Sequence, residues 1–168
     1  MVSRRPLLLA SIATLGLTPY ASNAQSKAAA TEASVREAAA AYVLAWNSHD
    51  LQAWNNKLTE DIWYTEATDY YQRSKGRAAV NAFFGETVKT SDIAWQVTRV
   101  KLMPDGTATM VVKHSALILP KKAGKYASSF ESNPSVARWR IEDGQWKLFY
   151  FTTHKGTALD AMKKDGVE

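Results

Sequence analysis

The sequence predicts a single domain of the α+β class, in which helices come first and an antiparallel sheet follows. Apolar side chains recur at helical spacing in the first half of the chain, and from residue 93 onward they alternate with polar ones as strands require. Two turn sequences, Pro104-Asp105-Gly106 and Glu142-Asp143-Gly144, separate consecutive strands. Helices packed on a sheet are therefore expected.

The first 24 residues are expected to be an export signal that is removed. Arg4 and Arg5 precede an apolar run from Leu7 to Leu17, and Ser22-Asn23-Ala24 offers small residues for cleavage. An apolar run of about 11 residues is too short for a permanent membrane span. The arginine pair suits twin-arginine export of a folded protein and also suits the general secretory route. We expect a periplasmic or secreted protein with no stable membrane insertion after cleavage.

Length, composition and charge exclude several classes of site and partner. Removal of residues 1–24 from the 168-residue chain leaves 144 residues, enough for one domain that buries roughly two-thirds of its unfolded surface. The absence of cysteine excludes disulfides, a thiolate nucleophile and a thiolate metal site. The formal charge of +5 falls to +3 without Arg4 and Arg5, and no long basic run is interleaved with aromatic residues. Nucleic acid is therefore not an expected partner.

Three helices are expected after a linker at residues 25–33. The first begins near Ser34, because Ser34 and Glu37 have capping-box spacing. Asp50 is placed to cap a short second helix, and Gly76 precedes the third. Each helix has one apolar face. These faces are Val35, Ala39, Tyr42 and Trp46 in the first helix; Leu51, Trp54 and Leu58 in the second; and Val80, Phe83, Phe84 and Val88 in the third.

The strands follow from alternation. Ile62, Tyr64 and Glu66 alternate with Trp63 and Thr65, which predicts the first strand. Residues 67–75 are expected to form a loop or short hairpin. Further strands are expected at residues 93–103, 107–119, 136–141 and 145–153, with a long loop at 119–135. Residues 157–168 are expected to form a short tail, for which a helix is one alternative.

Several short motifs, in their order and spacing, resemble the nuclear-transport-factor-2-like superfamily, in its SnoaL-like and ketosteroid-isomerase-related branch. They are Tyr42-Val43-Leu44-Ala45-Trp46-Asn47, His49-Asp50-Leu51, Thr59-Glu60-Asp61, Lys75-Gly76-Arg77-Ala78-Ala79-Val80 with Phe83-Phe84, Arg138-Trp139-Arg140-Ile141, Asp143-Gly144-Gln145-Trp146-Lys147-Leu148 and Thr153-His154. The resemblance covers about residues 33–156, with the SnoaL-like domain expected at 34–156, and implies a cone-shaped curved antiparallel sheet wrapped around the N-terminal helices, a cystatin-like α+β barrel. It also implies a homodimer. It does not identify a reaction, because this scaffold hosts isomerases, dehydratases, cyclases, hydrolases and non-catalytic modules.

Glu66 is the first candidate catalytic residue. The resemblance places it where related isomerases carry a proton-abstracting aspartate. On a strand face shared with Ile62 and Tyr64, burial would raise the pKa of its carboxyl group and make it a usable base near neutral pH. The alternative is that Glu66 faces solvent or pairs with Arg73 or Arg77.

Tyr42 is the second candidate. It matches the family tyrosine that donates a hydrogen bond to a developing oxyanion. The family's second donor, a protonated acid, corresponds here to Ala137. Loss of one such donor costs about 3 kcal/mol of transition-state stabilisation, which argues against steroid isomerisation as such unless a histidine replaces it. The alternative is that Tyr42 fills the core.

Two histidines complete the polar candidates. His154 ends the last strand, on the face that alternation assigns to Trp146, Leu148 and Tyr150, and is expected to act as acid, base or hydrogen-bond donor. The alternative for His154 is a bond to a loop carbonyl. His114 alternates with apolar residues and is expected to point inward. The histidines are too dispersed for a recognisable metal-ligand spacing, so neither metal nor cofactor is predicted.

Aromatic residues are expected to line the cone, and a filled core is the alternative. The predicted substrate-binding side chains are Trp46, Tyr64, Trp95, His114, Trp139 and Tyr150. An aromatic wall with few polar groups suits a planar, apolar ligand.

Two functions remain open on the sequence alone. One is a cofactor-independent lyase, isomerase or cyclase acting on a small hydrophobic or aromatic compound, with Glu66 as base and Tyr42 and His154 at the substrate oxygen. The other is a non-catalytic ligand-binding or association module of the same fold. Convergence of these three side chains on one cavity would favour the enzyme.

Overall fold

The structure, a computed structural model, describes residues 30–66, 72–118 and 128–168, without the side chains of Glu66, Gln72, Ile118 and residues 128–133. The expected export signal and most of the expected linker therefore lie outside the described residues, as does the 119–127 part of the expected long loop. In the part that is described, no helix is long and apolar enough to cross a membrane.

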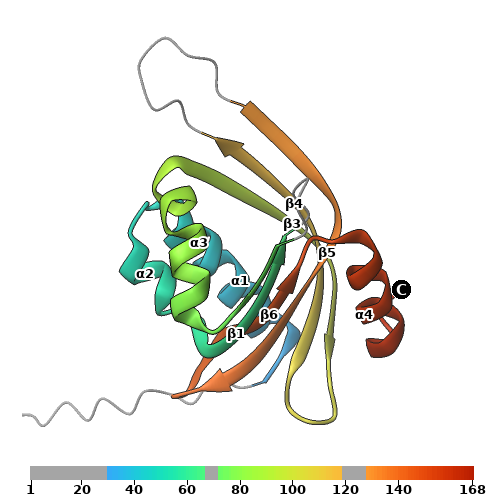
Figure 1. The fold of residues 1–168 in the computed structure, drawn as a ribbon. Helices are drawn as coiled ribbons and strands as arrows, with labels where there is room; N and C mark the ends of the chain where they lie inside the picture. The colour runs from blue at the N-terminus through green and yellow to red at the C-terminus, as the bar shows by residue number, and fades with distance from the viewer. Residues whose placement is uncertain (1–29, 67–71, 119–127) are drawn as a thin grey trace, which may run out of the picture.

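The fold is α+β, as predicted, with four helices and six strands in the described ranges. In chain order they are α1 Glu32–Asn47, α2 Leu51–Asn55, β1 Leu58–Glu66, β2 Gln72–Lys75, α3 Arg77–Thr90, β3 Ser91–Leu102, β4 Ala108–Ile118, β5 Ser128–Glu142, β6 Gln145–Thr152 and α4 Lys155–Asp165. The strands form one curved sheet in the order β2-β1-β6-β5-β4-β3. Figure 1 shows α1, α2 and α3 on the concave side of this sheet and α4 on the other side.

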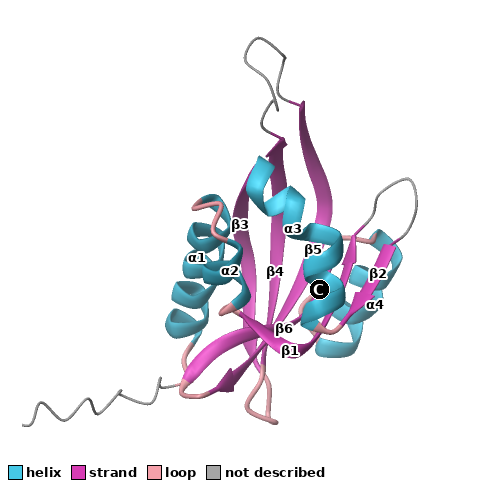
Figure 2. Ribbon diagram, turned by 60° about the vertical axis from the view of Figure 1, so that its left-hand side comes forward, coloured by secondary structure: helices cyan, strands magenta, loops and turns pink. Residues whose placement is uncertain are grey.

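Neighbouring strands are antiparallel except β1 and β6, which are parallel. This one parallel pair joins the first strand of the domain to the last. The longest strands, β3, β4 and β5, run side by side and build the tall wall of the cone, as Figure 2 shows. The resemblance-based expectation of a curved sheet around the N-terminal helices is confirmed.

The helix starts follow capping chemistry. Helix α1 begins two residues before the expected Ser34, because Thr31 is the N-cap and Ser34 is its capping-box partner. The prediction for Asp50 is confirmed, since its Oδ1 accepts hydrogen bonds from the backbone N–H groups of Gln52 (2.9 Å) and Ala53 (3.1 Å). Gly76 precedes α3 with a φ of +86°, a left-handed conformation that favours glycine.

The main core lies between the helices and the concave face of the sheet. Its fully buried members include Trp54, Tyr42, Phe84, Ile62 and Leu148. Burial of each large apolar side chain contributes about 1.5–3 kcal/mol, so this cluster is the principal source of stability. Specific polar contacts fix α1 against the sheet: the indole N–H of Trp46 donates to the Ser91 carbonyl at 3.0 Å, and Asn47 exchanges two hydrogen bonds with the backbone of Ile93.

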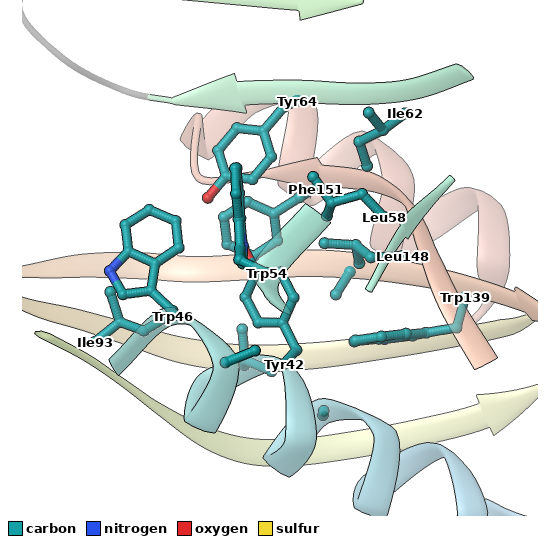
Figure 3. Packing of buried hydrophobic residues seen from close by; sticks show 14 of the residues in the cluster. Tyr42, Trp46, Trp54, Leu58, Ile62, Tyr64, Ile93, Trp139, Leu148 and Phe151 are labelled. Atoms are coloured by element: carbon teal, nitrogen blue, oxygen red, sulfur yellow. The ribbon is translucent and has the colours of Figure 1, made fainter. Parts of the chain in front are cut away.

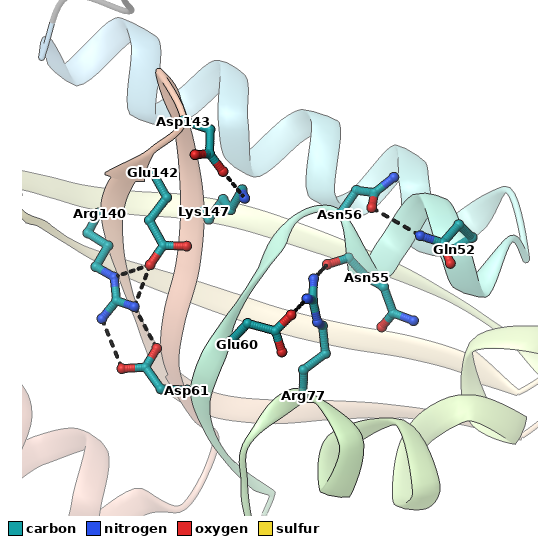
Figure 4. Close-up of polar contacts among 10 residues, drawn as sticks. All are labelled: Gln52, Asn55, Asn56, Glu60, Asp61, Arg77, Arg140, Glu142, Asp143 and Lys147. Atoms are coloured by element: carbon teal, nitrogen blue, oxygen red, sulfur yellow. Dashed lines mark hydrogen bonds and ion pairs between the residues drawn. The ribbon is translucent and has the colours of Figure 1, made fainter.

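Ion pairs on the surface join β1 to β5 and to α3 (Figure 4). Arg140 of β5 binds Asp61 and Glu142, and its hydrogen bonds hold the pKa of the Asp61 carboxyl below its usual value. Arg77 at the start of α3 pairs with Glu60 and donates to the Asn55 carbonyl at 3.2 Å. These contacts are exposed or half-exposed, so each contributes little to stability.

A second, smaller core lies on the convex face, beneath α4. It consists of Val111, Val136, Tyr150, Ala158, Ala161, Met162 and Val167. A buried ion pair closes it: both carboxylate oxygens of Asp165 accept from Arg138, at 2.7 and 2.9 Å, and the Thr109 hydroxyl donates to Asp165 at 2.7 Å. The residues predicted as a tail thus form a helix that covers this face.

Two expectations about strands need correction. Strand β5 starts at Ser128, so the second half of the predicted 119–135 loop is strand. In β6 the alternation is interrupted, because Trp139 lies opposite Leu148 while Arg138 lies opposite Tyr150, which leaves Phe149 as the extra residue of a bulge. A bulge reverses the faces of the residues beyond it. Phe151, instead of Tyr150, therefore joins the main core.

Candidate functional site

The inner face of the sheet carries a dense aromatic cluster. We call Tyr42, Trp46, Trp54, Tyr64, Trp95, Trp139 and Phe151 the inner aromatic cluster. Figure 3 shows these side chains, apart from Trp95, pointing toward one another from the helices and the sheet. Tyr42 stacks on Trp95 with ring centroids 4.7 Å apart, and Trp95 stacks on Phe151 at 5.1 Å with ring planes only 7° from parallel. Trp139 meets Tyr42 edge-on at 6.2 Å. Stacked and edge-on ring pairs of this kind are the arrangements that aromatic side chains prefer when they pack on one another.

His114 is the polar group attached to this cluster. It lies on β4, is 4% exposed, and its Nδ1 is 2.8 Å from the indole Nε1 of Trp95. An indole N–H can only donate, so Nδ1 must accept, and the neutral ring then carries its proton on Nε2. Burial lowers the pKa of His114 from 6.5 to about 4. Near neutral pH this side chain is therefore an uncharged imidazole with a defined tautomer.

Tyr42 lies deeper than the prediction of a catalytic hydroxyl requires. It has no exposed surface, and its ring is surrounded by Trp46, Trp54, Trp95 and Trp139. Ala137, at the position of the family's second donor, is equally buried in the main core. The predicted substrate-binding residues Trp46, Tyr64, Trp95, His114 and Trp139 do belong to this inner region.

His154 and Tyr150 are placed differently from the prediction. His154 caps α4, where its Nδ1 accepts from the backbone N–H of Thr157 at 3.4 Å and lies 3.2 Å from the Thr157 hydroxyl. Tyr150 belongs to the convex-face core, with the Arg138 guanidinium 4.8 Å from its ring centroid. The bulge at Phe149 is the physical cause, because it turns this end of β6 over. The structure therefore does not bring His154 to the inner aromatic cluster.

Glu66 is described only through its backbone. It is the last residue of β1 and lies opposite Gln72 of β2. Its side chain lies outside the described part, so its predicted role as a base stays a prediction. Arg77, one of its two alternative partners, pairs with Glu60.

Sequence reasoning missed two members of the site. Phe151 was hidden by the bulge, and Trp54 was recognised as a helix-face residue without being assigned to the site. The indole N–H groups of Trp54 and Trp139 are buried and find no acceptor among the described residues. No group of three or more His, Cys, Asp or Glu side chains within those residues is arranged to hold a metal ion.

A curved six-stranded sheet that encloses an aromatic interior behind N-terminal helices defines a cone-shaped α+β domain. The family model of the SnoaL-like domain matches residues 39–149, and the chain belongs to this family. No curated protein matches.

Solved structures share the fold at low sequence identity. A ketosteroid isomerase-like protein from Erwinia carotovora atroseptica SCRI1043 has a TM-score of 0.58 and 18% identity, over 71% of this chain and 92% of its own. A putative scytalone dehydratase from Novosphingobium aromaticivorans DSM 12444 has a TM-score of 0.58 and 12% identity, over 71% and 80%. A cystatin-like domain from Nostoc punctiforme PCC 73102 has a TM-score of 0.55 and 20% identity, over 82% and 88%.

Proposed function

We propose that the protein is a cofactor-independent acid–base enzyme, a lyase, isomerase or cyclase, that acts on a small hydrophobic or aromatic compound. The observation that carries the proposal is His114: a buried, neutral imidazole of defined tautomer, bonded to a tryptophan that is itself stacked in the inner aromatic cluster. Structural cores rarely need an ionisable group, whereas sites of proton transfer use groups with shifted pKa values.

The chemistry follows from this pairing. In the proposed reaction, Glu66 removes a proton from a carbon next to a carbonyl group, and the electron pair moves onto the carbonyl oxygen. The Nε2–H of His114 donates a hydrogen bond to that oxygen. The neutral imidazole already carries this proton, so it needs no change of protonation state. The electron pair then returns from the oxygen, and the protonated Glu66 gives its proton either to another carbon, in an isomerisation, or to the departing group, in an elimination. His114 thus fills the role that the sequence assigned to His154.

Two observations favour the second candidate, a ligand-binding module without catalysis. Tyr42 is packed by four tryptophans with no exposed surface, and Ala137 replaces the second oxyanion donor. An aromatic compound would then bind beside Trp95 and His114 and leave unchanged. Under either candidate we also propose that the protein is exported and forms a homodimer, as the signal sequence and the family resemblance suggest.

The test begins with native mass spectrometry of compounds that co-purify with the exported protein. A panel of cyclic enones and β-hydroxy ketones is then incubated with the protein in D₂O, and NMR records deuterium uptake, isomerisation and elimination. Glu66→Gln is expected to lower the rate by at least about a hundredfold. Glu37→Gln, an exposed change on α1, is the matched control and is expected to leave the rate unchanged.

Three results separate the two candidates. Turnover that needs both Glu66 and His114 supports the enzyme. Turnover that survives Glu66→Gln contradicts the assigned base. Tight binding of an aromatic compound, with no deuterium uptake across the panel, would favour the ligand-binding module.

A further inference from the structure

A groove lies on the opposite side of the sheet from the inner aromatic cluster. It has a volume of about 380 Å³, within the range of small-molecule sites, and lies between α4 and the convex face of β3, β4 and β5. We call it the outer groove. Its apolar walls include Val111, Leu159, Met162 and Val167, and its cations are Arg99 and Lys113. Leu159 is 41% exposed, so an apolar wall of the groove faces solvent.

A β-bulge places Arg99 at this groove. Val97 lies opposite Val112 and Arg99 lies opposite Val111, so Thr98 is an extra residue in β3. Residues two apart in a regular strand share a face, yet Val97 packs on the main core while Arg99 lines the outer groove. Bulges re-aim side chains in this way and are enriched beside functional sites.

Cationic side chains outnumber acidic ones in the lining of the outer groove, which contains Arg99, Lys113 and Glu168. Arg138, on the same face, is neutralised by Asp165. Arg99 donates to the Val167 carbonyl at 2.9 Å, and within the described part of the chain neither Arg99 nor Lys113 forms an ion pair. One acidic residue, Glu168, also lines the groove. Two cations beside an apolar wall are complementary to a ligand with an anionic head and an apolar tail.

We propose that the outer groove binds a free amphipathic carboxylate. The head lies between Arg99 and Lys113, and the tail lies along Val111, Met162 and Leu159. This inference does not depend on the proposed catalytic function, because the groove shares no residue with the inner aromatic cluster.

The experiment compares three probes with the same tail: decanoate, decanol and decyltrimethylammonium, each titrated below its micelle concentration into the full isotope-labelled chain. Decanoate is expected to bind at least about tenfold more tightly than the cation, because only its head complements Arg99 and Lys113. Backbone amide shifts are expected at residues 98–99, 111–113 and 159–167. Equal affinity for the three heads, or shifts confined to other residues, would overturn the proposal.

Charge variants provide a test with opposite signs. Lys113→Gln is expected to weaken decanoate binding about three- to fivefold, and Glu168→Gln to strengthen it by a similar factor. Lys164→Gln makes the same charge change on α4 away from the groove and is expected to have no effect. Unchanged affinity in both groove variants contradicts the proposal.

Two other occupants are checked in the same samples. Size-exclusion chromatography with light scattering detects a dimer, and a dimer whose formation shifts the groove residues would show that a second copy covers the groove. Sedimentation with phosphatidylglycerol vesicles, without decanoate binding, would show a lipid surface instead. Either result overturns the assignment to a free carboxylate.

Discussion

Trp95 and His114 determine each other's state. The Trp95 indole can only donate, so it fixes the lone pair of His114 at Nδ1, and protonation of that nitrogen would break a 2.8 Å bond inside the core. Burial acts in the same direction and lowers the pKa of His114 to about 4. Two effects therefore keep the imidazole of His114 neutral: its burial in the core and its hydrogen bond from Trp95.

This arrangement predicts a dependence of stability on pH. Between about pH 6.5 and 4 the unfolded chain protonates His114 and the folded chain does not, so stability falls as the pH falls through this window. The loss attributable to His114 is up to about 3 kcal/mol. Urea unfolding of the wild type and of His114→Gln, whose side-chain oxygen can still accept from Trp95, should show it at pH 7 and pH 4.

The comparison controls for the other histidines, since His49 and His154 are present in both proteins. A decrease in stability of the same size in His114→Gln and wild type would contradict the assignment. NMR titration of the histidine ring protons gives a direct check, with the His114 signal expected to stay in its neutral position down to about pH 5.

Alternation along a strand predicted that His114 points inward, and it does. It did not predict that Trp95 would be its partner. An unbroken β3–β4 register extended from Leu102 opposite Ala108 would place Gln96 opposite His114; the extra residue Thr98 shifts the register so that Trp95 takes that place. Bulges arise from the packing of the whole sheet, so one sequence read locally does not reveal them.

At the scale of elements, the same limit explains the errors in β6. The hairpin around Glu142-Asp143-Gly144 was predicted, and its first pairs match regular alternation. Beyond the bulge at Phe149 the faces reverse, so Tyr150 and His154 depart from their predicted positions while Phe151 enters the core. Helix caps were predictable at Asp50 because a cap depends on three neighbouring residues.

Besides the apolar core beneath it, helix α4 is fastened to the sheet by one buried ion pair. Asp165 is 7% exposed and accepts from Arg138 and Thr109, while the Lys101 ammonium donates to its backbone carbonyl at 2.8 Å. Asp165→Asn leaves the Arg138 charge without its partner, so we expect a loss of about 3 kcal/mol. Chemical denaturation measures this loss, and hydrogen exchange should show the largest loss of protection in α4.

Asp160→Asn is the matched control, because Asp160 is an exposed residue of the same helix. It is expected to change stability by less than about 0.5 kcal/mol. If Asp165→Asn were as mild as Asp160→Asn, the ion pair would not be what fastens α4 to the sheet.

At the scale of the whole molecule, one sheet serves two separate cores. Side chains of β4 alternate strictly between them: Met110 and Val112 face the helices α1–α3, and Val111 faces α4. The parallel pairing of β1 with β6 closes the concave core without α4. The concave core thus carries the inner aromatic cluster, and the convex core carries the outer groove.

This division predicts the effect of removing residues 154–168. The chain ending at Thr153 should keep the near-ultraviolet circular dichroism of the inner aromatic cluster, because none of its members contacts α4 through the convex core. It should also expose Val111, Val136 and Tyr150 together, and such an apolar patch promotes association. Light scattering is therefore expected to show stronger concentration-dependent self-association for the truncated chain than for the full chain. Loss of the near-ultraviolet signal on truncation would mean that the two faces fold as one unit, and that the helix on the convex side supports the site on the concave side.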